Sequence, residues 1–199
     1  MKIFLTIVIS YLLGSLSTGI IYSKVTGAGD IRTKGSKNAG ATNVLRVMGK
    51  QAAIITLIGD MLKGILAALL GKWLVGGAFG GMLGSVFAVL GHSYPIFFEF
   101  KGGKGVATSF GSLLIAMPVP ILICFGVFVI TVAITRYVSL GSILAAATFP
   151  LMVLLTQPFE LPVFLLSLFE GAFVIYRHRS NIGRLLRHEE NKLSFSKKA

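Results

Sequence analysis

The sequence is poor in charge and in cysteine, and both shortages limit what the chain can be. Only 13% of its 199 residues are charged and 54% are hydrophobic, whereas a soluble domain carries about 25% charged residues. Because such a chain cannot hide its apolar surface in a core of its own, we expect lipid to be its solvent. The single cysteine, Cys124, lies within an apolar run, so neither an intramolecular disulfide nor a cysteine-based metal site can form.

Acidic residues are also scarce. Seven Asp and Glu stand against 19 Lys and Arg, which gives a net charge of +12. A balance of this kind often indicates nucleic-acid binding, but here the basic residues gather at the ends of apolar runs. Basic cytoplasmic loops of a membrane protein explain that pattern better, and we expect no nucleic-acid partner.

Several patterns typical of catalytic sites are missing. The chain has no HxxxxD pair, no GxSxG elbow and no His/Glu cluster with zinc spacing. An enzyme with this sequence therefore has no obvious protein nucleophile, and we expect neither a metal nor a cofactor. It would act by positioning a substrate that arrives already activated and by neutralising its charge.

Apolar segments of the length that crosses a bilayer recur along the chain. We predict an all-α integral membrane protein, one domain over residues 1–199, with seven transmembrane helices at 3–22, 52–70, 75–90, 106–117, 119–135, 140–155 and 161–176. The segments at 75–90 and 106–117 are short and contain glycine, so each is a full span, a short buried helix or a re-entrant element.

Charge predicts the orientation of these spans. With seven crossings, all Lys and Arg except Lys2, Lys63 and Lys72 lie on one side, which the positive-inside rule makes cytoplasmic. The N-terminus is then outside and the C-terminus is cytoplasmic. If 75–90 and 106–117 both failed to cross, Lys101 and Lys104 would move to the outer side, so the charge favours seven spans.

Three polar, glycine-rich loops fall on this cytoplasmic face, at 35–43, 102–105 and 178–184. Each combines accessible backbone N–H groups with donor side chains, which is the chemistry that holds a phosphate. The first loop supplies neutral donors at Ser36, Asn38, Thr42 and Asn43. Arg46 follows Thr42 by four residues, so a helix that begins near residue 41 places both on one face.

The second loop, Gly102-Gly103-Lys104-Gly105, resembles half of a nucleotide P-loop, although the full pattern is missing. It opens the span at 106–117, so its N–H groups are expected to be donors at a helix N-terminus. The aromatic run at 92–100 just upstream is expected at the membrane interface, near where acyl chains enter.

The third loop carries His178, Arg179, Asn181 and Arg184. A basic cluster after a final span is also common simply because it keeps that end of the chain on the cytoplasmic side. Ser142, at the start of the sixth span, is a further candidate for the site. Inside the membrane, Asp60 and Lys63 are three residues apart and can pair on one helix face, whereas Glu170 needs a partner from elsewhere.

Jointly, these motifs resemble those of the bacterial acyl-phosphate-dependent glycerol-3-phosphate acyltransferases, the integral-membrane family called PlsY. The matching stretches are GSKNAGATNVLR at 35–46, GH at 91–92, KGGKGVAT at 101–108 and HRSNI at 178–182, with support from DIR at 30–32, DMLKG at 60–64 and VSLGS at 138–142. Two positions depart from the family pattern. No proline follows Gly14-Ser15, and His188 stands where the family usually has glycine, which leaves open the bend of the first span and the shape of the third loop.

The resemblance implies transfer of a fatty acyl group from acyl phosphate to the 1-hydroxyl of sn-glycerol 3-phosphate, giving lysophosphatidate and phosphate. It places the enzyme in the bacterial inner membrane with its site on the cytoplasmic face. Its partners are then acyl phosphate, glycerol 3-phosphate and membrane lipids, with a functional link to the enzyme that forms acyl phosphate.

Residue chemistry and the resemblance together predict the roles at the site. We expect Lys104 and the N–H groups of Gly102 and Gly103 to hold the acyl-phosphate head, helped by Thr42 and Asn43. We expect glycerol 3-phosphate to be bound by Ser36, Arg46, His178 and Asn181. Ser142 and Asn38 could complete the pocket of either substrate. The catalytic set is Lys104, His178, Asn181 and Ser142. The base is either His178 or a phosphate oxygen of a substrate.

Two other classes of function use the same features. A phosphate-ester transporter would use the donors and the short spans, but no inverted repeat is visible and the donors lie on one face. A membrane scaffold with basic lipid-binding loops explains the charge but not the density of Ser, Asn, Thr and Gly in the loops.

Overall fold

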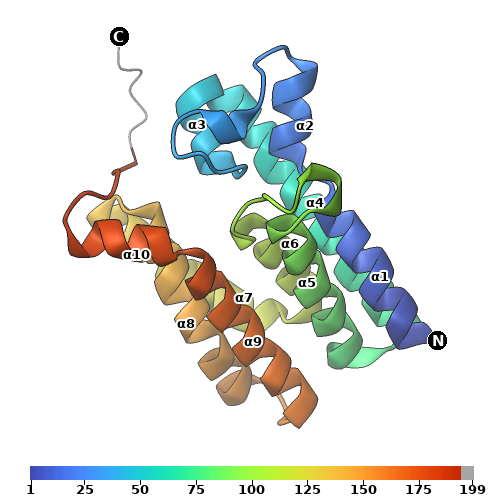
Figure 1. Cartoon of the computed structure of the whole chain (residues 1–199). Helices are drawn as coiled ribbons and strands as arrows, with labels where there is room; N and C mark the ends of the chain where they lie inside the picture. The colour runs from blue at the N-terminus through green and yellow to red at the C-terminus, as the bar shows by residue number, and fades with distance from the viewer. Residues whose placement is uncertain (194–199) are drawn as a thin grey trace. The chain divides into compact units, whose positions relative to one another are not determined.

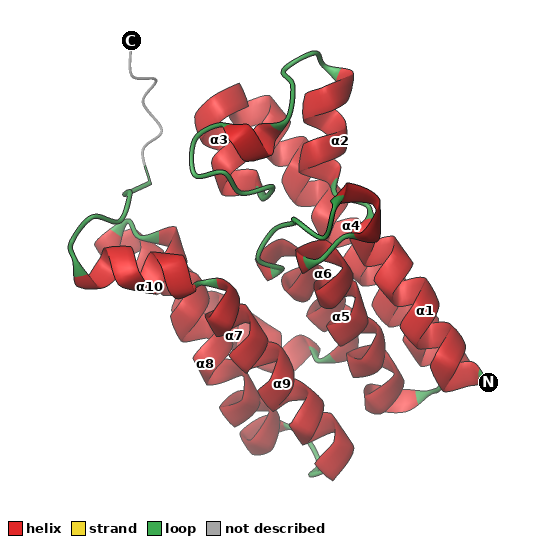
Figure 2. Cartoon of the chain, viewed as in Figure 1, coloured by secondary structure: helices red, strands yellow, loops and turns green. Residues whose placement is uncertain are grey.

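The computed structural model describes residues 1–193, so Lys197 and Lys198 of the charge count lie outside the described residues. Within the described part every regular element is a helix (Figure 2), which confirms the predicted all-α class. The chain forms two compact units, Met1–Pro118 and a second that begins at Val119. Each unit is described by itself.

The first unit is a bundle of long helices with short ones at the loops. Its elements are α1 (Lys2–Ser15), α2 (Thr18–Val25), η1 (Ile31–Thr33), α3 (Ala41–Met48), α4 (Lys50–Leu74), α5 (Gly77–Ser93), η2 (Ile96–Phe98) and α6 (Val106–Ala116). In Figure 1, α1, α4, α5 and α6 lie side by side, and α4 contacts each of the other three.

The second unit contains α7 (Pro118–Thr135), α8 (Val138–Thr156), α9 (Leu161–Arg177) and α10 (Arg179–Leu186). Helices α8 and α9 pack along each other, and α10 contacts both. The chain bends by 56° between α9 and α10. As a result, the third loop of the sequence is a short helix that turns away from the last span.

All seven predicted spans are helical, but not all are long enough to cross a bilayer unaided. Five segments have the length and hydropathy of a span, namely Lys2–Val25, Lys50–Leu74, Gly77–Phe98, Pro118–Thr135 and Val138–Thr156, and the bent pair of α9 and α10 makes a sixth. Helix α6 is apolar but has only 11 residues. Seven crossings and the sides of the two termini therefore stay predictions.

Glycine seams let the helices of the first unit approach each other through their backbones. A Cβ placed on Gly14, Gly64 or Gly111 would overlap a backbone oxygen of the neighbouring helix, at Ala88, Thr108 or Met61 respectively. Close approach through small residues is how helices associate in lipid, where no hydrophobic force drives them together. A packing role is thus evident for these glycines, whereas Gly126 of α7 has nothing within 4 Å of an added Cβ.

The first predicted span is broken. Leu16 and Ser17 have extended backbones, with ψ of 92° and 100°, between the end of α1 and the start of α2. A break at this point frees backbone carbonyls of the last turn of α1. The helix is therefore interrupted at this point although the sequence has no proline there.

The second departure from the family pattern is His188, whose backbone has the conformation that a glycine would adopt. His188 follows the end of α10 and has a φ of 58°, which is the left-handed conformation that glycine usually supplies after a helix. Its N–H donates to the Leu185 carbonyl, and that of Glu189 donates to Arg184. The third loop therefore closes in the usual way, with a histidine in the strained position.

The glycine seam between α4 and α6 generates a stability prediction. Replacing Gly111 with Ala should lower the free energy of unfolding by about 1–3 kcal/mol, because the new methyl group meets the Met61 backbone and the helices must separate. This loss should exceed the gain in helix propensity of about 1 kcal/mol that Ala brings. Thermal unfolding in detergent measures the difference.

The matched control is Gly126→Ala, which adds the same methyl group to a helix where it meets nothing. It should be neutral or slightly stabilising. Equal melting temperatures for the two variants would contradict the close approach of α4 and α6.

Candidate active site

The first loop is shaped by the side chain of Asn43, which is 2% exposed. Its Nδ2 donates to the carbonyls of Ile31, Lys34 and Asn38 at 3.2, 3.0 and 2.9 Å, and its Oδ1 accepts the Ser36 N–H at 2.7 Å. The amide is thus occupied with the loop backbone. This arrangement shows that Asn43 holds the loop backbone in place, and its contact with a substrate phosphate stays a prediction.

The remaining predicted donors of the first loop lie around the start of α3. This helix begins at Ala41, which confirms the expected start and places Thr42 and Arg46 one turn apart on one face. Asn38 accepts the Gly40 N–H at 3.0 Å and so closes the turn into the helix. Ser36 and Arg46 are exposed and Thr42 is half-buried.

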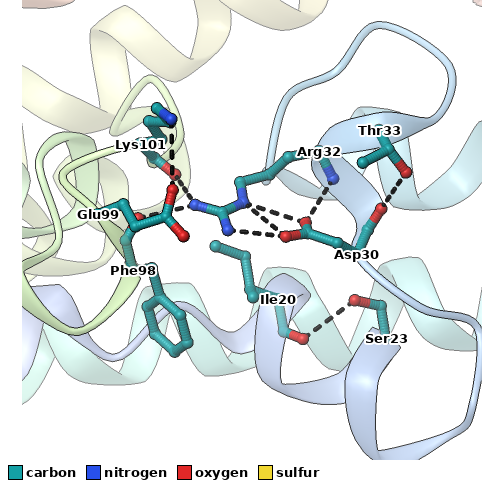
Figure 3. Close-up of polar contacts among 8 residues, drawn as sticks. All are labelled: Ile20, Ser23, Asp30, Arg32, Thr33, Phe98, Glu99 and Lys101. Atoms are coloured by element: carbon teal, nitrogen blue, oxygen red, sulfur yellow. Dashed lines mark hydrogen bonds and ion pairs between the residues drawn. The ribbon is translucent and has the colours of Figure 1, made fainter.

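Arg32, which precedes the first loop, binds the segment that leads into the second loop (Figure 3). Its Nη1 donates to the carbonyls of Phe98 and Lys101 at 2.7 and 3.3 Å. Its Nε and Nη2 bind the Asp30 carboxylate at 2.7 to 3.1 Å, and these hydrogen bonds lower the pKa of Asp30. Since η2 and its flanks carry exposed Phe97 and Phe100, Arg32 also fixes the aromatic run that precedes the glycine loop.

The second loop is closed onto the end of α5. The Gly102 N–H donates to the Ser93 carbonyl at 3.2 Å, and the Gly103 N–H donates to the His92 carbonyl at 3.1 Å. These two N–H groups are engaged with protein carbonyls in the structure, and their role in holding the acyl-phosphate head stays a prediction. The loop still leads into the N-terminus of α6, which begins at Val106 as predicted. Lys104 stands half-buried just before it.

A buried ionic cluster lies beneath this loop. Asp60 and Lys63 pair on α4 as predicted, with Nζ and Oδ1 3.0 Å apart. The same Nζ donates to the carbonyls of Gly14 and Leu16, both at 2.8 Å, and lies 2.9 Å from Nδ1 of His92 on α5. Lys63 therefore satisfies carbonyls at the break between α1 and α2.

In the second unit, the Glu190 carboxylate accepts hydrogen bonds from residues of the third loop. Its Oε1 accepts from Asn181 at 2.8 Å and from Ser139 at 3.0 Å, and its Oε2 accepts from Arg184 at 2.7 Å. Although burial opposes ionisation, these hydrogen bonds lower its pKa. We did not single out Glu190 from the sequence. The available signal was a pair of adjacent carboxylates in a basic tail, Glu189 and Glu190.

The other predicted residues of this unit also have defined partners. Nδ1 of His178 lies 2.8 Å from the Val174 carbonyl, so this nitrogen carries a proton and Nε2 is the acceptor of the neutral ring. Ser142 donates to Val138 at 2.9 Å within α8. Glu170 is buried in α9. Among residues 1–193, no group of three or more His, Cys, Asp and Glu is arranged to hold a metal ion.

These observations define an all-helical integral membrane protein with polar, glycine-rich loops between its apolar helices. The model of the family described as glycerol-3-phosphate acyltransferase matches residues 4–188. The chain belongs to the glycerol-3-phosphate acyltransferase family, whose members are integral-membrane acyltransferases of lipid biosynthesis.

Individual relatives and solved structures agree with this assignment. The glycerol-3-phosphate acyltransferase of Clostridioides difficile is 45% identical over 195 residues, which cover 96% of this chain and 95% of the relative. That of Burkholderia pseudomallei is 44% identical over 200 residues, covering 100% and 98%. The crystal structure of PlsY (YgiH), an integral membrane glycerol 3-phosphate acyltransferase in its glycerol 3-phosphate form, is similar with a TM-score of 0.91 and 37% identity, covering 98% of this chain and 96% of that one.

The Glu190 network predicts a pH dependence of stability. Because folding lowers the pKa of Glu190, its contribution is present above the pKa of the unfolded chain and is lost as the pH falls through the folded pKa. Glu190→Gln should therefore be less stable than the parent at pH 7. The difference between the two should shrink only as the pH falls below the unfolded pKa of 4.5, in thermal unfolding at a series of pH values.

Glu189→Gln is the matched control, because the neighbouring carboxylate is exposed and pairs with the exposed Arg187. It should follow the parent at every pH. A constant difference between Glu190→Gln and the parent across the series would argue against an ionised Glu190 in the folded state.

Proposed function

We propose that this protein transfers a fatty acyl group from acyl phosphate to the 1-hydroxyl of glycerol 3-phosphate, releasing lysophosphatidate and inorganic phosphate. The match of the family over residues 4–188 carries the proposal for the acceptor. The related PlsY was crystallised in a glycerol 3-phosphate form and a lysophosphatidic acid form. The chemistry of the loops supports an activated donor, because none of the motifs singled out supplies a nucleophile.

The whole chain is proposed to act as one transmembrane acyltransferase domain in the bacterial inner membrane, with its loops on the cytoplasmic side. Glycerol 3-phosphate arrives from the cytosol, and acyl phosphate lies in the bilayer with its head at the surface. A functional link to the enzyme that makes acyl phosphate follows, since that donor is both amphipathic and reactive.

Each loop has a proposed role in holding the two phosphates. Lys104 and the N-terminus of α6 would bind the acyl-phosphate head, with Thr42 beside them and with Gly102 and Gly103 shaping the loop. Glycerol 3-phosphate is assigned to Ser36, Arg46, His178 and Asn181. We keep Asn38, Asn43 and Ser142 as supporting residues of these pockets. Charge-assisted hydrogen bonds of this kind contribute about 1.5–3 kcal/mol each.

In the reaction, the 1-hydroxyl oxygen forms a bond to the acyl carbonyl carbon, and the bond from that carbon to phosphate breaks. The hydroxyl proton passes to a base, which is either a phosphate oxygen of a substrate or His178. The Val174 carbonyl holds the proton of His178 on Nδ1, which leaves the Nε2 lone pair for that role. The positive charge of Lys104 would stabilise the developing and departing negative charge.

The first test is direct assay of the purified protein with acyl phosphate and labelled glycerol 3-phosphate. Lysophosphatidate should form without acyl-CoA or acyl carrier protein. Lys104→Ala should lower turnover by about a hundredfold or more, because a preorganised charge at the reacting group is lost.

Lys101→Ala is the matched control for this test, because that lysine is exposed three residues earlier and pairs with Glu99 on the surface. It should retain near-parental turnover. Equal activity of the two variants would refute the assignment of Lys104, and absence of product from the parent protein would refute the acyl-phosphate donor.

The identity of the base is tested by His178→Ala. If a substrate phosphate takes the proton, the variant should keep measurable turnover with weakened binding of glycerol 3-phosphate. If His178 is the base, turnover should vanish while calorimetric binding of glycerol 3-phosphate persists. Measuring kcat and binding on the same preparation separates the two mechanisms.

A further inference from the structure

A buried ionic cluster outside the proposed substrate contacts joins two distant parts of the first unit. Asp60, Lys63 and His92 are 1%, 5% and 3% exposed. Ionised groups within a membrane-spanning helix are expensive and are retained where they hold structure or serve chemistry. The contacts of this cluster reach the break between α1 and α2 on one side and the glycine loop on the other.

Lys63 has four polar partners. Its Nζ donates to the carbonyls of Gly14 and Leu16 at 2.8 Å and lies 2.9 Å from Nδ1 of His92. Oδ1 of Asp60 pairs with the same Nζ at 3.0 Å and lies 3.6 Å from Nδ1 of His92. Lys63 therefore joins the break of the first span to the His92 ring.

The contact with Lys63 and Asp60 fixes the orientation of the His92 ring, because Nδ1 lies 2.9 Å from Nζ of Lys63 and 3.6 Å from Oδ1 of Asp60. The Nε2 edge faces the glycine loop, since a Cβ added to Gly103 would overlap it. The His92 carbonyl also accepts the Gly103 N–H. One side of His92 is thus held by Lys63, and the other side supports the loop that presents Lys104.

We propose that Asp60, Lys63 and His92 form a positioning unit for substrate phosphate, in which Lys63 fixes His92 and His92 fixes the glycine loop. None of the three is assigned a contact with substrate. The inference rests on the proposed role of Lys104 at the site. Loosening the loop should weaken binding of a phosphate substrate before it slows turnover of the bound complex, because a loop that moves no longer presents its cation at a fixed place.

The test compares His92→Ala with the parent by hydrogen exchange and by kinetics. In the absence of substrate, amides of residues 102 and 103 should exchange faster in the variant, while exchange across α8 and α9 stays unchanged. The KM for one of the two phosphate substrates should rise roughly tenfold or more, with a smaller change in kcat.

Two conservative variants separate positioning from general destabilisation. His92→Gln keeps an N–H near the place of Nε2 and should partly restore both slow exchange and the parental KM. His92→Asn keeps an acceptor for Lys63 and so protects the fold, but its side chain is too short to support the loop, and it should behave as His92→Ala does.

Unchanged exchange at residues 102 and 103 in both His92→Ala and His92→Asn would overturn the proposal. Faster exchange throughout the first unit with an unchanged KM would also overturn it, because the cluster would then serve stability alone. Since the exchange measurement needs no substrate, its outcome is independent of whether acyl phosphate proves to be the donor.

Discussion

The ammonium group of Lys63 is the contact on which the first unit depends. In a bilayer, every backbone polar group needs a protein partner, and a broken helix exposes carbonyls that lipid cannot satisfy. The first span breaks at Leu16 and Ser17, and Lys63 donates to the carbonyls of Gly14 and Leu16 there. Asp60 balances the charge. Removing one partner of such a buried pair costs about 3–5 kcal/mol, because the other charge is left without compensation.

This contact is possible only because the helices lie very close together. Gly14 places α1 against Ala88 of α5, and Gly64, the neighbour of Lys63, places α4 against Thr108 of α6. Each glycine removes the side chain that would otherwise keep the backbones apart. The close packing at these glycines thus brings the broken first span and His92, which contacts the glycine loop, within reach of the Lys63 side chain.

Local patterns predicted the helices and several of their ends, including the start of α3 at Ala41 and of α6 at Val106. The Asp60–Lys63 pair was also predictable, since residues three apart share a helix face. Contacts between distant residues were not predictable, because they depend on which segments pack together. Examples are the hydrogen bonds from Arg32 to the Phe98 carbonyl, from Asn181 to Glu190, and from the Gly102 N–H to the Ser93 carbonyl.

The number of crossings shows a different limit of sequence patterns. Hydropathy identifies an apolar helix, but crossing depends on length, and α6 has 11 residues where about 20 span a bilayer. The broken first span is the converse case. Its hydropathy fits a single span over residues 2–25, and only the structure shows the break, in the extended backbones of Leu16 and Ser17.

The glycine seams have a consequence for the lipid that such a protein handles. Where two helices meet backbone to backbone, as α4 does with α5 at Gly71 and Gly84 and with α6 at Gly111, the space between them is narrower than a hydrocarbon chain. These seams therefore cannot serve as a tunnel for a fatty tail.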